Sequence, residues 1–114
     1  MAEKNIFQKI IDREIPADIV YEDDLCLAFE DINPRAPIHL IVIPKKDIAS
    51  VDDVSEQDET VIGHLFAAMA KIAAKLRLSG GYRVVANCGP DAGQEVMHLH
   101  FHLLAGRELG WPPG

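Results

Sequence analysis

The chain has 114 residues, of which 48% are hydrophobic and 25% are charged. These proportions are ordinary for a globular protein, so they exclude wholesale disorder and allow one domain with a single core. The formal net charge of −7 excludes non-specific binding of nucleic acid, because a polyanionic backbone must be neutralised by Lys and Arg side chains.

The two cysteines and the N-terminal residues bear on the location of the protein. Cys26 and Cys88 lie far apart without Cys-x-x-Cys spacing, which favours a reducing compartment over a disulfide framework. Residues 1–4 lack the apolar stretch of a signal peptide, and no apolar run approaches the roughly 18 residues of a membrane span. The sequence therefore predicts a cytoplasmic protein with no membrane partner.

The first half of the chain predicts one short helix and three strands. Apolar residues recur at helical spacing in residues 5–13, and Pro16 forbids extension of this helix. The apolar runs 19–22 and 26–31 are divided by two aspartates and predict a hairpin. A connection with two prolines then leads into a third strand at residues 39–43.

The second half predicts a long helix followed by two strands. Residues 55–58 resemble a capping box, and apolar residues then recur at spacings of three and four as far as residue 76. His64 lies on this helix, and the sequence suggests no partner for it. Residues 82–87 and 97–105 are the fourth and fifth predicted strands.

Three histidines stand at alternate positions of the last predicted strand, with apolar residues between them. Side chains alternate across a strand, so His98, His100 and His102 would line one face, and residues 97, 99, 101 and 103 would face the core. Neighbouring imidazoles would then lie roughly 6.5 to 7 Å apart, close enough to share one substrate group. Two chemistries fit this pattern: a zinc site, or catalysis by histidine as nucleophile and acid–base.

Two flanking segments add to this interpretation. The glycine-containing loop 88–94 enters the histidine strand directly, and such loops allow backbone N–H groups to point at an anion. Few acids lie close to the histidines in the sequence, which favours catalysis without a metal. The tail contains the only tryptophan, Trp111, followed by two prolines, and is expected to dock on this subunit or a neighbouring one.

The segment His98–Leu104 matches the pattern His-φ-His-φ-His-φ-φ, with φ apolar, at every position. The sequence thus resembles the histidine-triad (HIT) family from about residue 6 to residue 114. The closing Trp-Pro-Pro-Gly is most similar to the Hint branch, the histidine-triad nucleotide-binding phosphoramidases, with the Fhit dinucleotide hydrolases as the alternative. The resemblance implies one HIT domain over residues 1–114, with a short tail from about residue 107. It also implies an α+β fold with a five-stranded antiparallel sheet, one long and one short helix, and sheets joined across a homodimer.

The resemblance also implies an activity and a set of site residues. Family members bind purine nucleoside monophosphates and cleave the P–N bond of substrates such as adenosine 5′-phosphoramidate through a nucleotidyl-histidine intermediate, releasing amine and monophosphate. No metal or cofactor is implied. By position, His100 is the nucleophile, and His102, His98 and His39 complete the catalytic group. The nucleotide-binding residues are Phe7, Ile10, Phe29, Asp31, Ile32, Asn87, Gly93, Gln94, Glu95 and Val96, together with His100 and His102.

Two features leave alternatives open. Animal members of the branch have Ser where this chain has Glu95, whose charge would lie beside an anionic substrate unless it points away or contacts a cationic amine. Three adjacent histidines repel one another when protonated, and His102 is the expected cation among them.

The alternative to an enzyme is a nucleotide-binding scaffold that acts through protein partners and hydrolyses only incidentally.

Overall fold

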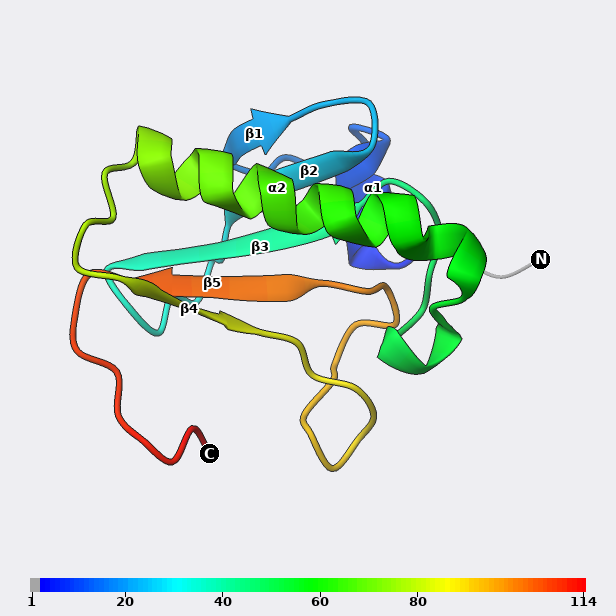
Figure 1. Cartoon of the computed structure of the whole chain (residues 1–114). Helices are drawn as coiled ribbons and strands as arrows, with labels where there is room; N and C mark the ends of the chain where they lie inside the picture. The colour runs from blue at the N-terminus through cyan, green and yellow to red at the C-terminus, as the bar shows by residue number, and fades with distance from the viewer. Residues whose placement is uncertain (1–2) are drawn as a thin grey trace.

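The computed structural model describes residues 3–114. The prediction that no signal peptide is present concerns residues 1–4, of which the first two lie outside the described residues. In chain order the elements are α1 (Ile6–Ile11), β1 (Ile19–Glu22), β2 (Cys26–Glu30), β3 (Ile38–Pro44), the 3-10 turns η1 (Val51–Asp53) and η2 (Glu56–Asp58), α2 (Glu59–Lys75), β4 (Tyr82–Val85) and β5 (Phe101–Ala105) (Figure 1).

The strands form one antiparallel sheet in the order β1-β2-β3-β5-β4. The long helix α2 crosses one face of this sheet, and the short helix α1 lies on the other side (Figure 1). The predicted α+β fold with five antiparallel strands, one long helix and one short helix is therefore confirmed. The edges of the sheet are β1 and β4. Joining of two sheets across a homodimer stays a prediction.

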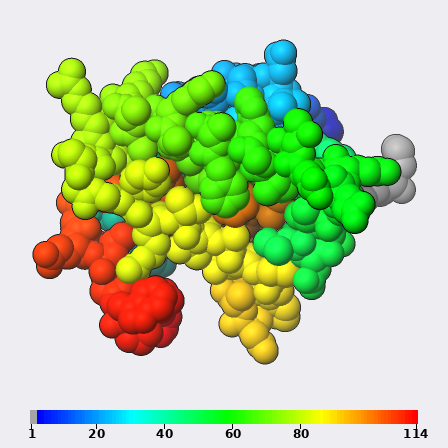
Figure 2. Space-filling view, viewed as in Figure 1, coloured from blue at the N-terminus to red at the C-terminus, as the bar shows by residue number. Residues whose placement is uncertain are grey.

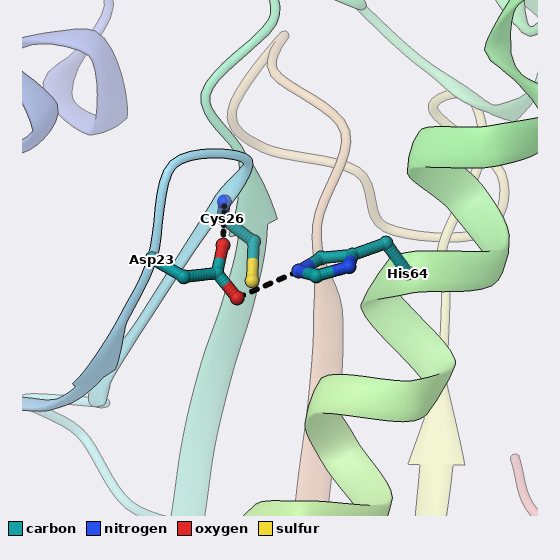
Figure 3. A group of neighbouring side chains, drawn as sticks. All are labelled: Asp23, Cys26 and His64. Atoms are coloured by element: carbon teal, nitrogen blue, oxygen red, sulfur yellow. Dashed lines mark hydrogen bonds and ion pairs between the residues drawn. The ribbon is translucent and has the colours of Figure 1, made fainter.

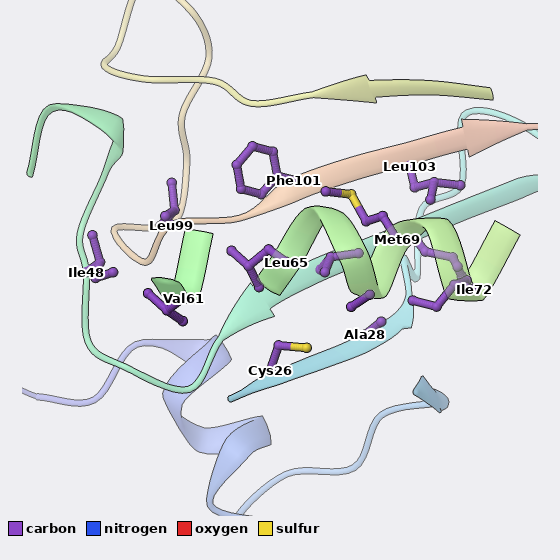
Figure 4. Packing of buried hydrophobic residues seen from close by; sticks show 13 residues of the cluster. Cys26, Ala28, Ile48, Val61, Leu65, Met69, Ile72, Leu99, Phe101 and Leu103 are labelled. Atoms are coloured by element: carbon purple, nitrogen blue, oxygen red, sulfur yellow. The ribbon is translucent and has the colours of Figure 1, made fainter. Parts of the chain in front are cut away.

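Alternation along β2 and β3 explains why both faces of the sheet are covered. In β2, Cys26 and Ala28 face α2, whereas Leu27 and Phe29 face α1. Because both faces are buried, these strands are continuous apolar runs in the sequence. Thirteen buried residues form the core under α2 (Figure 4): Cys26, Ala28, Leu40, Val42, Ile48, Val61, Leu65, Ala68, Met69, Ile72, Leu99, Phe101 and Leu103.

The two helices begin at capping boxes. Asn5 and Gln8 exchange side-chain and backbone hydrogen bonds at the start of α1, and Ser55 and Asp58 do the same before α2. These bonds satisfy N–H groups that have no partner within a helix. The capping box predicted for residues 55–58 is confirmed, although it first opens the 3-10 turn η2 rather than the α-helix itself.

The fifth strand is shorter than predicted, because the segment before Phe101 leaves the sheet. The last paired position is Val42 with Phe101, and the N–H of Leu99 donates instead to the carbonyl of Ile48 at 2.7 Å. Met97, predicted to face the core, is 56% exposed. Only His102 of the three histidines thus belongs to a strand. Strand β4 likewise ends at Val85, two residues earlier than predicted.

The C-terminal tail projects beside β4 (Figure 2). Trp111 is 81% exposed, and the Arg83 guanidinium lies 6.0 Å from the centre of its ring while donating to the Gly110 carbonyl. Docking of the tail on a neighbouring subunit stays a prediction. No helix among residues 3–114 is long and apolar enough to cross a membrane. The cytoplasmic location also stays a prediction.

Candidate functional site

A cavity of about 470 Å³ opens on the side of the sheet that carries α1. Its volume falls within the usual range for small-molecule and cofactor sites. Twelve of the predicted site residues line it: Phe7, Ile10, Phe29, Asp31, Ile32, His39, Asn87, Gly93, Glu95, Val96, His100 and His102. The fold therefore gathers the predicted set from α1, β2, β3, β5 and two loops. The roles assigned to these residues stay predictions.

Sequence analysis gave no role to several residues that line the cavity. They are Ile15, Pro16, Ala17, Asn33, Arg35 and Ile41. Ile6, which the resemblance implies as a weaker candidate for contact with the base, also lines the cavity. Arg35 matters most, because it is the one Lys or Arg among the lining residues. A signal for it was present, since Arg35 lies in the proline-rich turn between Asp31 and His39. That turn was interpreted only as a connection.

The nucleophile candidate His100 is held in one tautomer by its neighbour. Its Nδ1 lies 2.7 Å from the backbone carbonyl oxygen of His98. A carbonyl accepts hydrogen bonds only, so Nδ1 carries the proton and Nε2 of the neutral ring keeps its lone pair. The ring packs edge-on against Phe7, with the ring centres 4.9 Å apart. His100 thus has a fixed ring with an unprotonated nitrogen, as a nucleophile requires.

A chain of hydrogen bonds fixes the tautomers of His39 and His102. The backbone N–H of Arg35 donates to Nδ1 of His39 at 3.0 Å, so the neutral His39 ring carries its proton on Nε2. That proton points at Nδ1 of His102, 2.8 Å away. Nδ1 of His102 is therefore the acceptor, and its proton is on Nε2. A carboxylate oxygen of Asp31 lies 3.4 Å from Nε2 of His39.

The three histidines of the cavity favour their neutral forms. Burial lowers the pKa of His39, His100 and His102 below the ordinary value of 6.5. The neighbouring His100 and His39 rings lower the pKa of His102 further, and the Asp31 carboxylate only partly opposes this. The expected cationic state of His102 therefore does not hold in the free protein. In its neutral form, His102 still carries a hydrogen-bond donor on Nε2.

These lowered pKa values predict an acid limb in the pH profile. For any reaction that uses neutral His100, we expect the acid limb of kcat/KM to be centred below pH 6.5, because burial lowers the pKa of His100 from that value. Below the lowered pKa of His100, protonation removes the nucleophile, and activity should fall about tenfold per pH unit. Initial rates between about pH 4.5 and pH 8, corrected for spontaneous acid hydrolysis, measure this. An acid limb centred above pH 6.5 would contradict it.

His98 is placed differently from the prediction. It is fully buried and does not line the cavity. Its Nε2 donates to the carbonyl oxygen of Pro44 at 2.9 Å, and its Nδ1 has no hydrogen-bond partner among the described residues. The three imidazoles do lie on the side of the sheet that carries α1, because the ring centres of His98 and His100 lie 6.3 and 4.9 Å from that of Phe7, and those of His100 and His102 lie 5.1 Å apart. The prediction that all three share one substrate group is wrong, since His98 does not line the cavity. The His98 side chain is used inside the core, in its bond to Pro44, whereas its backbone carbonyl accepts from His100.

The loop before the histidines is closed by Gln94. Its side chain accepts from the Gly89 N–H at 3.0 Å and donates to the carbonyls of Ala49 and Val96. Its own N–H donates to the Gly89 carbonyl at 3.1 Å, so this group is not directed at a ligand. Gln94 does not line the cavity, unlike Gly93. Gln94 thus supports the loop. The resemblance also implies that the backbone at Glu95 and Val96 surrounds the phosphate, and this stays a prediction.

The structure gathers a different set of possible zinc ligands from the three histidines suggested by the sequence. The donor atoms of Asp31, His39 and His102 lie within 4.8 Å of one another, whereas His98 and His100 are not part of this group. In the metal-free arrangement, His39 and His102 use the nitrogens that face each other for their mutual hydrogen bond. A metal ion bound there would break the bond that sets the tautomer of His102.

Comparison with known proteins places this site in a family. The family model for the HIT domain matches residues 12–109. The chain belongs to the HIT domain family. An uncharacterized HIT-like protein of Synechococcus elongatus is 57% identical over 114 residues, which is the full length of both chains. A second such protein from Synechocystis is 52% identical over the same length.

Solved HIT structures share the fold closely. A HIT family hydrolase from Legionella pneumophila superposes with a TM-score of 0.95 at 47% identity, covering 97% of this chain and 100% of the other. A histidine triad nucleotide-binding protein from Candida albicans gives a TM-score of 0.82 at 32% identity, covering 96% of this chain and 83% of the other. The HIT fold of this chain is thus shared with proteins described as hydrolases and as nucleotide-binding.

Proposed function

We propose that this HIT protein is a hydrolase that binds purine nucleoside monophosphates and cleaves the P–N bond of nucleoside 5′-phosphoramidates. The observation that carries the proposal is the tautomer of His100, whose unprotonated Nε2 belongs to a ring lining the cavity. The names of the relatives support it, because the Legionella protein is a HIT family hydrolase and the Candida protein is nucleotide-binding. The more specific Hint assignment belongs to this proposal.

The cavity has an apolar and a polar part that suit the two ends of a nucleotide. We assign the base to the apolar wall, where Phe7 and Phe29 pack with ring centres 5.6 Å apart and Ile10 is buried beside them. Asp31 accepts hydrogen bonds from the ribose hydroxyls. The phosphate then lies toward His102, where Asn87 and the loop N–H groups donate to its oxygens.

The reaction proceeds in two displacements at phosphorus. In the first, Nε2 of His100 forms a bond to phosphorus, the P–N bond of the substrate breaks, and the amine takes up a proton from solvent as it departs. In the second, water attacks phosphorus, the bond to His100 breaks, and a proton passes to solvent. The products are the nucleoside monophosphate and the amine. The Nε2–H of His102 stabilises the charge on the phosphate oxygens.

The direct test is hydrolysis of adenosine 5′-phosphoramidate by the purified protein, followed by phosphorus NMR. We expect AMP and ammonia as products, formed with multiple turnovers. Diadenosine polyphosphate serves as the comparison substrate, since faster cleavage of it would favour the dinucleotide hydrolase. Binding of AMP without turnover of either substrate would favour the scaffold and overturn the proposed activity.

The negative charge of Glu95 leads us to expect a preference for positively charged leaving amines. Glu95 is an exposed residue of the cavity lining, and we assign its carboxylate to contact a positively charged leaving amine, such as that of a nucleotidyl-lysine. Replacing Glu95 by Gln should lower kcat/KM for a lysine phosphoramidate about three- to fivefold, the size of a solvent-screened charge pair. A phosphoramidate of a neutral amine is the matched control and should not lose activity. Equal losses on both substrates would contradict the assignment.

A further inference from the structure

A second group of chemically active side chains lies outside the histidine cavity. Asp23 comes from the turn between β1 and β2, Cys26 from the start of β2, and His64 from α2 (Figure 3). The expectation that His64 has no partner is wrong, because its Nε2 lies 2.6 Å from Oδ2 of Asp23. The donor atoms of all three residues lie within 4.8 Å of one another. None of the three lines the cavity.

We propose that Asp23, Cys26 and His64 form a binding site for a divalent transition-metal ion, with Zn²⁺ as the preferred ion. The set offers one carboxylate oxygen, one sulfur and one imidazole nitrogen. Zinc is bound in proteins by these three donor types, whereas Ca²⁺ and Mg²⁺ prefer oxygen ligands alone. Asp23 and Cys26 belong to the same hairpin, whereas His64 lies 41 residues beyond Asp23, so this site is created by the packing of α2 on the hairpin.

The carboxylate is oriented before any ion binds. Oδ1 of Asp23 accepts from the backbone N–H groups of Leu25 at 2.8 Å and Cys26 at 3.0 Å. These bonds turn Oδ2 toward the helix, where the hydroxyl of Tyr21 also donates to it at 2.9 Å. Hydrogen bonds of this kind orient metal ligands in established sites. Tyr21 and the turn therefore supply the outer support that a metal site needs.

Only small movements are required to admit an ion. Zinc ligands lie about 2.0 to 2.3 Å from the metal, so two of them in a tetrahedral site are roughly 3.3 Å apart or more. The 2.6 Å contact between His64 and Asp23 must therefore open by less than about 1 Å. The side chains of Asp23 and His64 are 26% and 29% exposed, which gives ion and water a route to the site.

The three ligands balance the charge of a divalent ion. On binding, Zn²⁺ replaces the thiol proton of Cys26, which passes to solvent, and it is held by Nε2 of a neutral His64 imidazole whose ring proton is on Nδ1. One thiolate and one carboxylate then offset the two positive charges of the ion. The bound ion would link the β1–β2 hairpin to α2 and so stabilise the folded protein.

Cobalt provides a probe with a direct spectroscopic readout. We expect the metal-free full-length protein to bind one Co²⁺ at this site with a sulfur-to-cobalt charge-transfer band, which only a cysteine ligand produces. Zn²⁺ should displace the cobalt and raise the Tm. Cys26→Ala should abolish the band, and His64→Ala should weaken Co²⁺ binding at least tenfold. Cys88→Ser is the matched control and should keep both band and affinity.

The outcomes separate this site from the histidine cavity. An ion held by Asp31, His39 and His102 gives no charge-transfer band, because that group contains no sulfur. A wild-type protein without the band, a band lost in Cys88→Ser, or an unchanged affinity in His64→Ala would each overturn the proposal. If Cys26→Ala fails to fold by circular dichroism, His64→Ala decides, since its side chain is partly exposed.

Discussion

His100→Ala is expected to lower the single-turnover rate on a fluorogenic adenosine phosphoramidate by at least about a thousandfold. The reason is that the variant removes Nε2, the only atom assigned to bond with phosphorus. The neighbouring His102 is not placed to substitute for it, because its Nδ1 accepts from His39 and its Nε2 carries the proton. Rapid-quench measurement with enzyme in excess over substrate isolates the chemical step from product release.

AMP binding is the control for this variant. The apolar wall and Asp31 remain, so the Kd for AMP should change less than tenfold while hydrolysis is lost. The wild type, quenched with acid-free denaturant, should also show AMP attached to His100 by mass spectrometry. Equal rates for the wild type and His100→Ala would remove His100 as the nucleophile. Hydrolysis would then depend on a group other than His100.

The fold was predictable because its elements carry strong local signals. The long helix follows from apolar residues spaced by three and four between Val61 and Ile72, and its start follows from the capping box at Ser55. The hairpin follows from two apolar runs divided by Asp23 and Asp24. Each of these patterns depends on neighbours in the sequence, so tertiary contacts were not needed to recognise them.

The site was predictable in composition and less so in geometry. The alternation of His98, His100 and His102 assumed a regular strand, but the segment before Phe101 bonds to the loop carbonyl of Ile48 instead. That bond joins residues distant in sequence and has no local signal. The same is true of the contact between His64 and Asp23. Pairings of this kind begin β5 only at Phe101 and give His64 its partner.

Because His98 is buried in the core and does not line the cavity, we expect its variants to lose stability, whereas His100→Ala loses catalysis. His98→Ala should lower the free energy of unfolding by about 3 kcal/mol, because it opens a space in the core and leaves the Pro44 carbonyl without a donor. Where the variant is folded, its single-turnover rate should fall less than tenfold. The backbone carbonyl that sets the tautomer of His100 does not depend on the His98 side chain. Urea unfolding and rapid-quench assays measure the two effects.

Two further variants test this explanation. His98→Gln carries an amide donor that can replace the bond to Pro44, so it should recover part of the lost stability. Met97→Ala, at the exposed neighbouring position, should change the free energy of unfolding by less than about 0.5 kcal/mol. A stable His98→Ala variant whose chemistry fell as far as that of His100→Ala would restore the original catalytic role of the side chain. The expected separation arises because a buried imidazole supports the fold, whereas the carbonyl on the same residue supports the reaction.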